Sequence, residues 1–492
     1  METPMLDKPA PAGRSLHYGG GWHHPASGRY AWTLDPGVNE PICEVAEAGA
    51  ADVDAAVAAA SAAFRDWRRA LPLERGRILK EMAEIVRRNA RELAALDAQN
   101  CGNPVTEMLG DAKIAAAQLD FFGGLVTEMK GDTIPMGPDA LNLSLRQPLG
   151  VVARILAFNH PFMFCAGKIA APLAAGNTVI VKPPEQAPLS SLRLAELLEG
   201  LLPPGVLSVL PSGREAGAAL ACHPGIAKIA LIGSVPAGRA VMRAASETIK
   251  PVLLELGGKN ALIAFADADP DAVADAIVSG MNFTWCGQSC GSTSRAFLHD
   301  EIYEAVLARV PAKVARFVPG IPTEPSTTMG AIVSASQHER ILGFIASAKA
   351  EGARLVTGGK VPDAPELARG FYVEPTVFAD VTPAMQIARE EIFGPVLAVA
   401  RWRDEAAMLA EVNSVEYGLT CSIWTHDLGK AHRTAMEVEA GYVWINEVSK
   451  HFLGAPFGGW KQSGIGREEC LGELIAFTQE KNIHISLKQA KG

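Results

Sequence analysis

The chain has 492 residues, of which 48% are hydrophobic and 20% charged, and its formal net charge is −9. This length allows two or more domains with large cores, and the composition is that of a globular enzyme. The acidic balance argues against a nucleic-acid surface, because an acidic protein repels phosphate. No membrane span or export signal is expected: residues 1–14 are polar, and Lys168, Pro172 and Asn177 interrupt the longest apolar stretch, 162–181.

Eight cysteines are scattered along the chain without paired spacing. This pattern predicts free thiols and a reducing, cytoplasmic compartment. Cys286 and Cys290 are four residues apart, but no histidine or second cysteine pair lies near them. We therefore expect no zinc site and no other metal.

Residues 15–50 are rich in glycine, proline and turns, with short strand-like pieces. Helices are expected over 52–68, 73–98 and 103–129. Asp52 is the expected cap of the first helix. In the second, Ile78, Met82 and Ile85 keep the helical period of 3.6 residues.

The pattern changes at Gly150, where apolar runs begin to alternate with helices. Strands are predicted over 151–157, 178–181, 206–210 and 226–232, and helices over 161–175, 188–199 and 215–222. Such alternation indicates parallel βαβ units, which bind nucleotides at the carboxyl ends of their strands. From Gly257 to about Gln462 it continues, which indicates a second α/β domain.

Two distant segments, 141–146 and 483–488, alternate strictly between apolar and polar residues. Each could be an ordinary edge strand. We prefer a pairing of the two in a small protruding sheet, whose open edges would invite another subunit.

Cys290 lies in a segment rich in glycine and serine, 35 residues after Glu255, which ends an apolar strand and precedes Gly257 and Gly258. A thiolate attacks carbonyl carbon, and a carboxylate can activate the thiol or a water molecule. Each residue alone also has an ordinary structural interpretation, a small core side chain for the cysteine and a solvated charge for the glutamate. Together they indicate covalent catalysis on a carbonyl group.

Three further motifs follow predicted strands. Lys182 offers a cation and Glu185 an acceptor for two ribose hydroxyls. Gly233 and Ser234 open a helix with Pro236 in its first turn, which suits a phosphate. Glu391, Phe393 and Pro395 form a short acidic and aromatic unit that could hold a sugar and a ring. For the last two motifs a simple turn is the alternative.

Asn159 stands between a predicted strand and the helix that begins at Pro161. Its amide could donate to an oxyanion formed on a carbonyl group. It could equally cap that helix.

Taken together, seven separated motifs make the chain resemble the aldehyde dehydrogenase superfamily over nearly its full length. In order they begin at Phe158, Lys182, Gly233, Glu255, Gly287, Glu391 and Pro456. The chain departs from the family pattern in places. The family often has Trp at the position of Phe158 and Phe at that of His160, and residues 231–235 read Leu-Ile-Gly-Ser-Val instead of Phe-Thr-Gly-Ser-Thr.

The resemblance implies an α/β fold with a Rossmann-like NAD-binding domain (1–128 and 149–256), a catalytic domain (257–464) and an oligomerisation sheet (129–148 and 465–492). Cys290 would be the nucleophile and Glu255 the general base, with Asn159 and the Cys290 N–H as the oxyanion hole. Lys182, counted among the catalytic residues as well, and Glu185 would hold the adenosine ribose, Ser234 a phosphate and Glu391 the nicotinamide ribose. The remaining cofactor contacts would be Phe158, Gly213, Gly233, Leu256 and Phe393.

The implied reaction is oxidation of an aldehyde to a carboxylic acid through a Cys290 thioester. NAD is the expected cofactor, since Glu185 would repel the 2′-phosphate of NADP, which is the alternative. By family position Phe158, Phe162, Phe164, Ser289, His451 and Phe457 would line the substrate tunnel. Their aromatic character favours an aromatic or other apolar aldehyde. The alternatives are a semialdehyde or an amino or betaine-type aldehyde, a CoA-acylating enzyme, and a non-catalytic protein on this scaffold. A homodimer or homotetramer is expected.

Overall fold

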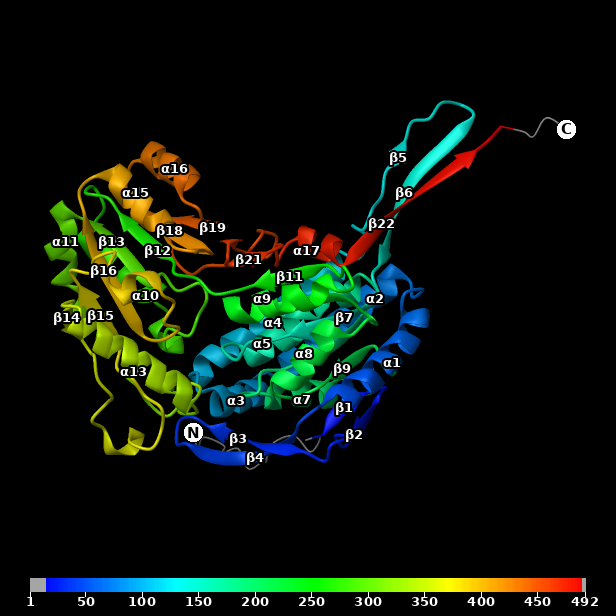
Figure 1. The fold of residues 1–492 in the computed structure, drawn as a ribbon, viewed down its shortest axis with the longest axis horizontal. Coiled ribbons are helices and arrows are strands. Elements are labelled where there is room, and N and C mark those ends of the chain that lie inside the picture. Colours follow the sequence, from blue (N-terminus) through cyan, green and yellow to red (C-terminus); the bar gives the residue numbers. More distant parts are fainter. Residues whose placement is uncertain (1–14, 489–492) are drawn as a thin grey trace.

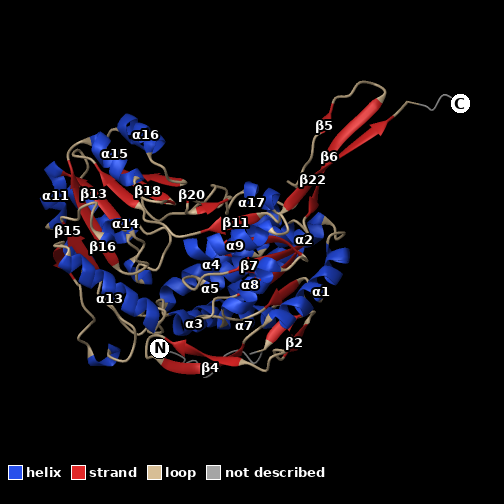
Figure 2. Ribbon diagram, viewed as in Figure 1, coloured by secondary structure: helices blue, strands red, loops and turns tan. Residues whose placement is uncertain are grey.

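The computed structural model describes residues 15–488, so residues 1–14 and the end of the second oligomerisation segment lie outside it. Two α/β units lie side by side, and a small sheet projects from one of them (Figures 1 and 2). Among the described residues no helix is both long and apolar enough to cross a membrane.

The first unit is built on an eight-stranded sheet with a parallel centre. Its strand order is β2 (Gly21–His23), β1 (Leu16–Tyr18), β9 (Leu207–Val209), β8 (Thr178–Lys182), β7 (Val151–Ile155), β10 (Ile226–Ile232), β11 (Val252–Glu255) and β21 (Gly464–Ile465). The chain moves outward from β7 to β9 and then crosses back to β10. The order therefore reverses between β7 and β10, where ligands bind in open α/β sheets.

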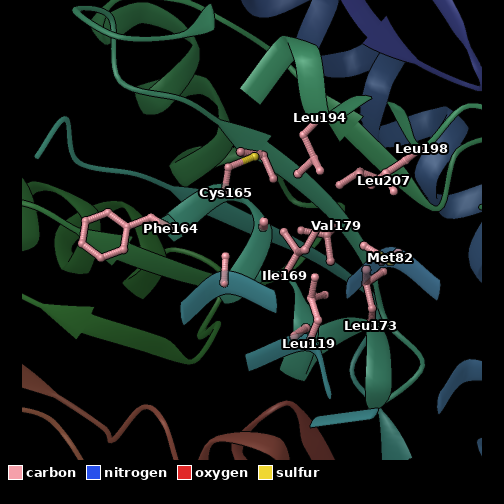
Figure 3. Close-up of a cluster of buried hydrophobic side chains, with 14 of the residues drawn as sticks. Met82, Leu119, Phe164, Cys165, Ile169, Leu173, Val179, Leu194, Leu198 and Leu207 are labelled. Atoms are coloured by element: carbon pink, nitrogen blue, oxygen red, sulfur yellow. The ribbon is translucent and has the colours of Figure 1, made fainter. Parts of the chain in front are cut away.

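Helices cover both faces of this sheet because its strands are apolar on both sides. Ala153 and Ile180 pack into one core, and Val152 and Val179 into the other. The first face carries α1 (Ala50–Trp67), α8 (Arg214–Cys222) and α9 (Val235–Ser246). The second carries α2 (Pro72–Arg88), α3 (Ala90–Cys101), α4 (Val105–Gly124), α5 (Pro161–Lys168), α6 (Ala170–Ala174) and α7 (Leu189–Leu197). Figure 3 shows part of this second core.

The second unit holds a seven-stranded sheet that is parallel except at one edge. Its order is β14 (Arg354–Thr357), β15 (Thr376–Ala379), β16 (Val396–Trp402), β13 (Arg295–His299), β12 (Ala261–Ala264), β18 (Thr420–Trp424) and β19 (Tyr442–Ile445). The α-helices around it are α10 (Pro270–Gly280), α11 (Asp300–Leu307), α12 (Val310–Val314), α13 (Ala335–Ala350), α14 (Gln386–Arg389), α15 (Glu405–Asn413) and α16 (Leu428–Glu437), with 3₁₀ turns at Phe283–Trp285 and Pro365–Leu367. Two short pairs lie outside both sheets, β3 (Tyr30–Asp35) with β4 (Glu40–Ala46) and β17 (Tyr417–Gly418) with β20 (Trp460–Lys461).

The projecting sheet, which we call the arm, confirms the pairing predicted from alternation. It consists of β5 (Thr133–Ile134), β6 (Ala140–Pro148) and β22 (Thr478–Ser486), and β22 follows helix α17 (Leu471–Ala476). Strands β6 and β22 run antiparallel over nine pairs, with Leu143 opposite Ile483. The arm stands clear of both α/β units (Figure 1).

Local details differ from the sequence predictions where backbone hydrogen bonding is interrupted. The helix expected over 73–98 is two helices that meet at Asn89, whose side-chain amide donates to the Ile85 carbonyl at 2.7 Å. The helix expected over 161–175 breaks at Ile169, because Pro172 has no N–H for the helical ladder. Asp52 is not the cap: Gly49 is, and Asp52, three residues later, accepts from its N–H at 2.8 Å.

Candidate active site

Four of the predicted site residues lie at one edge of the first sheet, because parallel strands present their carboxyl ends together. Lys182 ends β8 and Glu255 ends β11, while Asn159 and Gly233 follow β7 and β10. Ile232 of β10 pairs with Glu255. This edge faces the second unit, from which a loop brings in Cys290.

The Cys290 loop is folded tightly between α10 and β13. Cys286 and Gly287 take left-handed backbone angles, with φ of 55° and 63°. The side-chain amide of Asn260 donates to the carbonyl oxygen of Cys290 at 2.6 Å and so fixes the loop. A Cβ added at Gly258 would lie 2.7 Å from that same oxygen. Glycine at 258 is therefore what allows the Glu255 strand and the Cys290 loop to approach each other.

The Cys290 thiol and the Glu255 carboxyl group line the same cavity and are close enough to shift each other's pKa. Burial, reinforced by the charge of Glu468, raises the pKa of Glu255 to about 8. Burial and the neighbouring Glu255 raise the pKa of Cys290 well above its ordinary value. At neutral pH the pair thus holds both protons, and loss of one leaves a strong base or nucleophile in a dry site.

Asn159 is not a helix cap, so that alternative interpretation is wrong. His160 occupies the cap position of α5, and the N–H of Phe162 is satisfied by the Asp97 carboxylate at 2.9 Å. Asn103 donates to the Asn159 carbonyl oxygen at 2.7 Å and holds its backbone. The Asn159 side-chain amide has no hydrogen bond within residues 15–488 and lines the same cavity as Cys290. It is a free donor beside the thiol.

A cavity of about 280 Å³ opens at Cys290 and Glu255. Its walls are largely aromatic and aliphatic, formed by Ile114, Met163, Phe164, Trp285, Trp444, Leu453 and Phe457. Of the six predicted tunnel residues, Phe164, Ser289, His451 and Phe457 line it.

Phe158 and Phe162 do not line this cavity, which corrects their expected positions. Phe162 is only 2% exposed and packs in the core beneath α5. The ring of Phe158 lies edge-to-face on Phe393, with centroids 5.6 Å apart. Phe158 therefore belongs to the neighbouring Glu391 region.

The sequence reasoning missed a polar pair in the cavity wall. His160 Nδ1 lies 2.8 Å from the Asp111 carboxylate, and both residues line the cavity. Asp111 comes from α4, on which Ile114 and Gln118 also reach the cavity. Their spacing of three and four residues places them on one helix face. This spacing is the feature of the sequence from which their shared position could have been predicted.

A cluster of buried charges behind the cavity was also not predicted from the sequence. Lys168 Nζ lies 2.9 Å from Glu468 and 3.4 Å from Glu469. Arg154 lies 2.9 Å from Glu468 and 2.7 Å from Glu473. His451 joins the cluster from the cavity side, at 3.1 Å from Glu469.

The predicted adenosine residues form an open edge at the ends of β8 and β10. Lys182 is buried, which lowers its pKa to about 8. The side chain of Glu185 is exposed, and a Cβ added at Gly213 would lie 3.3 Å from its carboxylate. Ser234 is the exposed cap of α9 and accepts from the Ala237 N–H at 3.4 Å. Gly213 thus leaves space beside the Glu185 carboxylate. The N-terminus of α9 at Ser234 suits a phosphate.

Glu391 accepts a hydrogen bond from the Gly258 N–H at 2.9 Å, between the two units. Burial raises its pKa to about 7. Phe393, with a left-handed φ of 55°, is held through its carbonyl by Gln337 at 2.8 Å.

Leu256 lies under α9, where a Cβ at Gly238 would collide with its side chain. Glu185 and Glu391 are carboxylates of the kind that accept ribose hydroxyls, and the exposed start of α9 at Ser234 suits a phosphate.

Within the described part of the chain no cluster of histidine, cysteine or carboxylate side chains could hold a metal ion. The cavity brings together a thiol, a carboxyl group and an amide, those of Cys290, Glu255 and Asn159. This combination suits acyl transfer at a carbonyl carbon.

Comparisons with known proteins identify the family of this chain. The model of the aldehyde dehydrogenase family matches residues 22–483. The aldehyde dehydrogenase tropH of Talaromyces stipitatus is 52% identical over 98% of this chain and 95% of its own length. The betaine aldehyde dehydrogenase of Sinorhizobium fredii is 43% identical over 88% of this chain and 89% of its own length.

Among solved structures, the indole-3-acetaldehyde dehydrogenase AldA of P. syringae, in complex with NAD+ and IAA, superposes with a TM-score of 0.95. It is 36% identical, and the match covers 98% of both chains. These findings confirm the resemblance, the fold and the enzyme class inferred from the motifs. The chain belongs to the aldehyde dehydrogenase family.

Proposed function

We propose that the protein oxidises an aldehyde to the carboxylic acid with NAD, through an acyl group held on Cys290. The observation that carries this proposal is that Cys290, Glu255 and the unpaired amide of Asn159 line one largely apolar cavity. A merely structural thiol would need neither the carboxyl group nor the free amide.

In the first step Glu255 loses its own proton to solvent, and its carboxylate then takes the Cys290 proton as the sulfur adds to the aldehyde carbon. The carbonyl oxygen becomes an oxyanion, which the Asn159 amide and the Cys290 N–H stabilise. NAD, when bound, supplies the acceptor for the hydride that must leave this carbon.

In the second step the acyl group on Cys290 is hydrolysed. Glu255 first releases to solvent the proton that it received from Cys290. Its carboxylate then takes a proton from a water molecule, whose oxygen attacks the acyl carbon while the carbon–sulfur bond breaks. The acid departs and Cys290 is released as a thiolate. Because Glu255 stands ready for this step, hydrolysis is favoured over transfer to CoA.

The cofactor would lie along the edge from Glu185 to Glu391. Glu185 would accept hydroxyls of the adenosine ribose with Lys182 beside it, and the start of α9 at Ser234 would receive a phosphate. Glu391 would hold the second ribose, with Phe158 and Phe393 next to the ring. The exposed carboxylate of Glu185 supports NAD over NADP.

The substrate would be an aromatic or otherwise apolar aldehyde. Two groups of rings face the cavity, His160 with Phe164 and Trp285, and His451 with Trp444 and Phe457. Flat apolar walls of this kind suit a planar substrate. Betaine-type and semialdehyde substrates are the competing classes.

The test combines a substrate panel with trapping of the intermediate. Benzaldehyde, aliphatic, ω-amino and ω-carboxy aldehydes are assayed with NAD and NADP, and the product is identified as acid or, with CoA present, acyl-CoA. Quenched enzyme should carry the mass of the acyl group at Cys290, and Cys290→Ala should show neither adduct nor turnover. Turnover without the adduct, or no turnover with any aldehyde, would refute the proposal.

We also propose that the arm mediates homo-oligomerisation into a dimer or tetramer. Strand β22 pairs with β6 on one side, and its other edge has no partner strand within residues 15–488. Apolar side chains at Leu141, Leu145, Ile485 and Leu487 are exposed on the arm. An open apolar edge of this kind favours pairing with another copy. Light scattering on the full chain and on a variant cut after residue 477 tests this, and a monomeric full chain would contradict it.

A further inference from the structure

The pair formed by His160 and Asp111 is built into the substrate cavity but has no part in the proposed chemistry. His160 is 7% exposed and Asp111 2%, and Nδ1 of the ring lies 2.8 Å from the carboxylate. The ring is clamped edge-to-face between Phe164, at 5.5 Å, and Trp285, at 4.9 Å. Its position and orientation are therefore fixed from three sides.

With Nδ1 engaged by Asp111, the other ring nitrogen is left for the cavity, where it accepts a hydrogen bond when the ring is neutral and donates one when the ring is protonated. Nε2 has no partner within residues 15–488, although His160 lines the cavity. Burial opposes the charge of the ring, but contact with Asp111 outweighs it and raises the pKa of His160 above its ordinary value. When it is protonated, the ring presents an N–H at Nε2 to the cavity.

Two further polar groups of the same wall are also unsatisfied. The indole N–H of Trp285, which packs on His160, has no acceptor, and the side-chain oxygen of Gln118 has no donor. Buried polar groups without partners are uncommon in proteins and call for an explanation. The Gln118 oxygen is buried against Gly167 and the Trp285 N–H is also shielded, so the group of this wall that can reach a ligand is Nε2 of His160. A nitrogen that donates or accepts with its protonation state matches a hydroxyl group, which both accepts and donates.

We propose that His160, oriented by Asp111, is a specificity-determining residue that binds an oxygen substituent, in the first instance a ring hydroxyl, of an aromatic aldehyde. This inference rests on the proposed function, since it names the substrate class of the same cavity. Asp111 acts through His160 and is a positioning residue.

The charges around the cavity favour this neutral substituent over its rivals. Glu468 and Glu469 line the cavity together with Asp111. The basic side chains of the lining are His160, His451 and Lys168, and each of them already contacts a carboxylate. A substrate carboxylate would meet this acidic surface without a free cation. A substrate ammonium group would meet the N–H of His160 in place of the bare Asp111 carboxylate.

The experiment compares kcat/KM for benzaldehyde with that for its 2-, 3- and 4-hydroxy and methoxy derivatives. The wild type should prefer at least one oxygen-bearing isomer by about tenfold or more, because a site built to bind a hydroxyl rejects the analogue that lacks it. His160→Phe should reduce this ratio to about one while benzaldehyde is still oxidised. Asp111→Asn should reduce the ratio in part, and the volume-conserving Met163→Leu in the same wall should leave it unchanged.

Two results would overturn the inference: no preference in the wild type, or an unchanged ratio in His160→Phe, whether or not that variant loses activity with both substrates. A measurement that needs neither a variant nor turnover separates this inference from the proposed function. Titration calorimetry of the wild type should find 4-hydroxybenzyl or another hydroxybenzyl alcohol bound at least about tenfold more tightly than benzyl alcohol. Equal binding refutes the role of His160, whereas discrimination in an enzyme that oxidises no aldehyde refutes only the proposed function.

Discussion

Replacing Arg154 should destabilise the protein far more than replacing an exposed arginine with the same number of partners. Arg154 is 0% exposed on β7, and its guanidinium lies 2.9 Å from Glu468 and 2.7 Å from Glu473. In Arg154→Gln, Glu468 keeps Lys168 as its counterion, but Glu473 loses its ion-pair partner while 1% exposed. Breaking a buried pair from one side typically costs about 3–5 kcal/mol, because the remaining charge stays desolvated.

Urea unfolding of Arg154→Gln should show this loss as a lower midpoint at similar m value. Arg77→Gln is the matched control: Arg77 also pairs with two carboxylates, Glu74 and Glu81, but on the exposed face of α2, where loss of the pairs costs about 0–1 kcal/mol. Adding Glu473→Gln to the Arg154 variant removes the orphaned charge and should restore at least half of the stability. If Arg154→Gln loses no more than the control, or the second substitution restores nothing, the reasoning about desolvated charge is refuted.

Three further predictions concern the chemistry. Hydrolysis of the acyl-enzyme should accelerate from pH 6 and level off above about pH 8, because the pKa of Glu255 is raised to about 8 and only the carboxylate accepts a proton from water. Stopped-flow measurement of acyl-enzyme decay checks this prediction. The same pH profile in Glu255→Gln would contradict it. Asn159→Ala should lower kcat by about 10²- to 10³-fold through loss of one oxyanion donor, and steady-state rates that stay within threefold, or about 0.6 kcal/mol, would exclude that role. Glu185→Ser should raise kcat/KM with NADP relative to NAD by removing a charge that repels the 2′-phosphate; an unchanged ratio would place cofactor selection elsewhere.

The sequence could locate the reactive groups because they depend on local features. Glu255 stands at a strand end, and parallel strands bring such ends to one edge whatever their details. Gly258 marked a close approach of backbone, and the structure places the Cys290 carbonyl there. The strict alternation around Leu143 and Ile483 was enough to pair two strands that are 340 residues apart.

What could not be read from the sequence depends on packing between distant elements. Asp111 and His160 meet because α4 lies against α5, and no pattern around either residue sets that contact. From the sequence alone, Arg154 looks like an outward-facing charge in an otherwise apolar strand. In the structure it is paired with Glu473 of α17 and with Glu468, which lies just before that helix. Phe162 follows the motif that begins at Phe158, yet its side chain turns into the core, since neighbouring residues on a helix point about 100° apart.

Glu468 links the packing to the site, since it belongs to the buried charge cluster and also lines the cavity with Cys290 and Glu255. Burial is the largest cause of the raised pKa of Glu255, and the negative charge of Glu468 is the next. In Glu468→Gln that charge is gone, while Lys168 retains Glu469 and Arg154 retains Glu473. The pKa of Glu255 should then fall, so that its carboxylate forms at lower pH and the rise of acyl-enzyme hydrolysis shifts toward acid. If the rise occurs at the same pH in Glu468→Gln as in the wild type, burial alone sets the pKa of Glu255. The buried charge cluster would then stabilise the fold without affecting the chemistry.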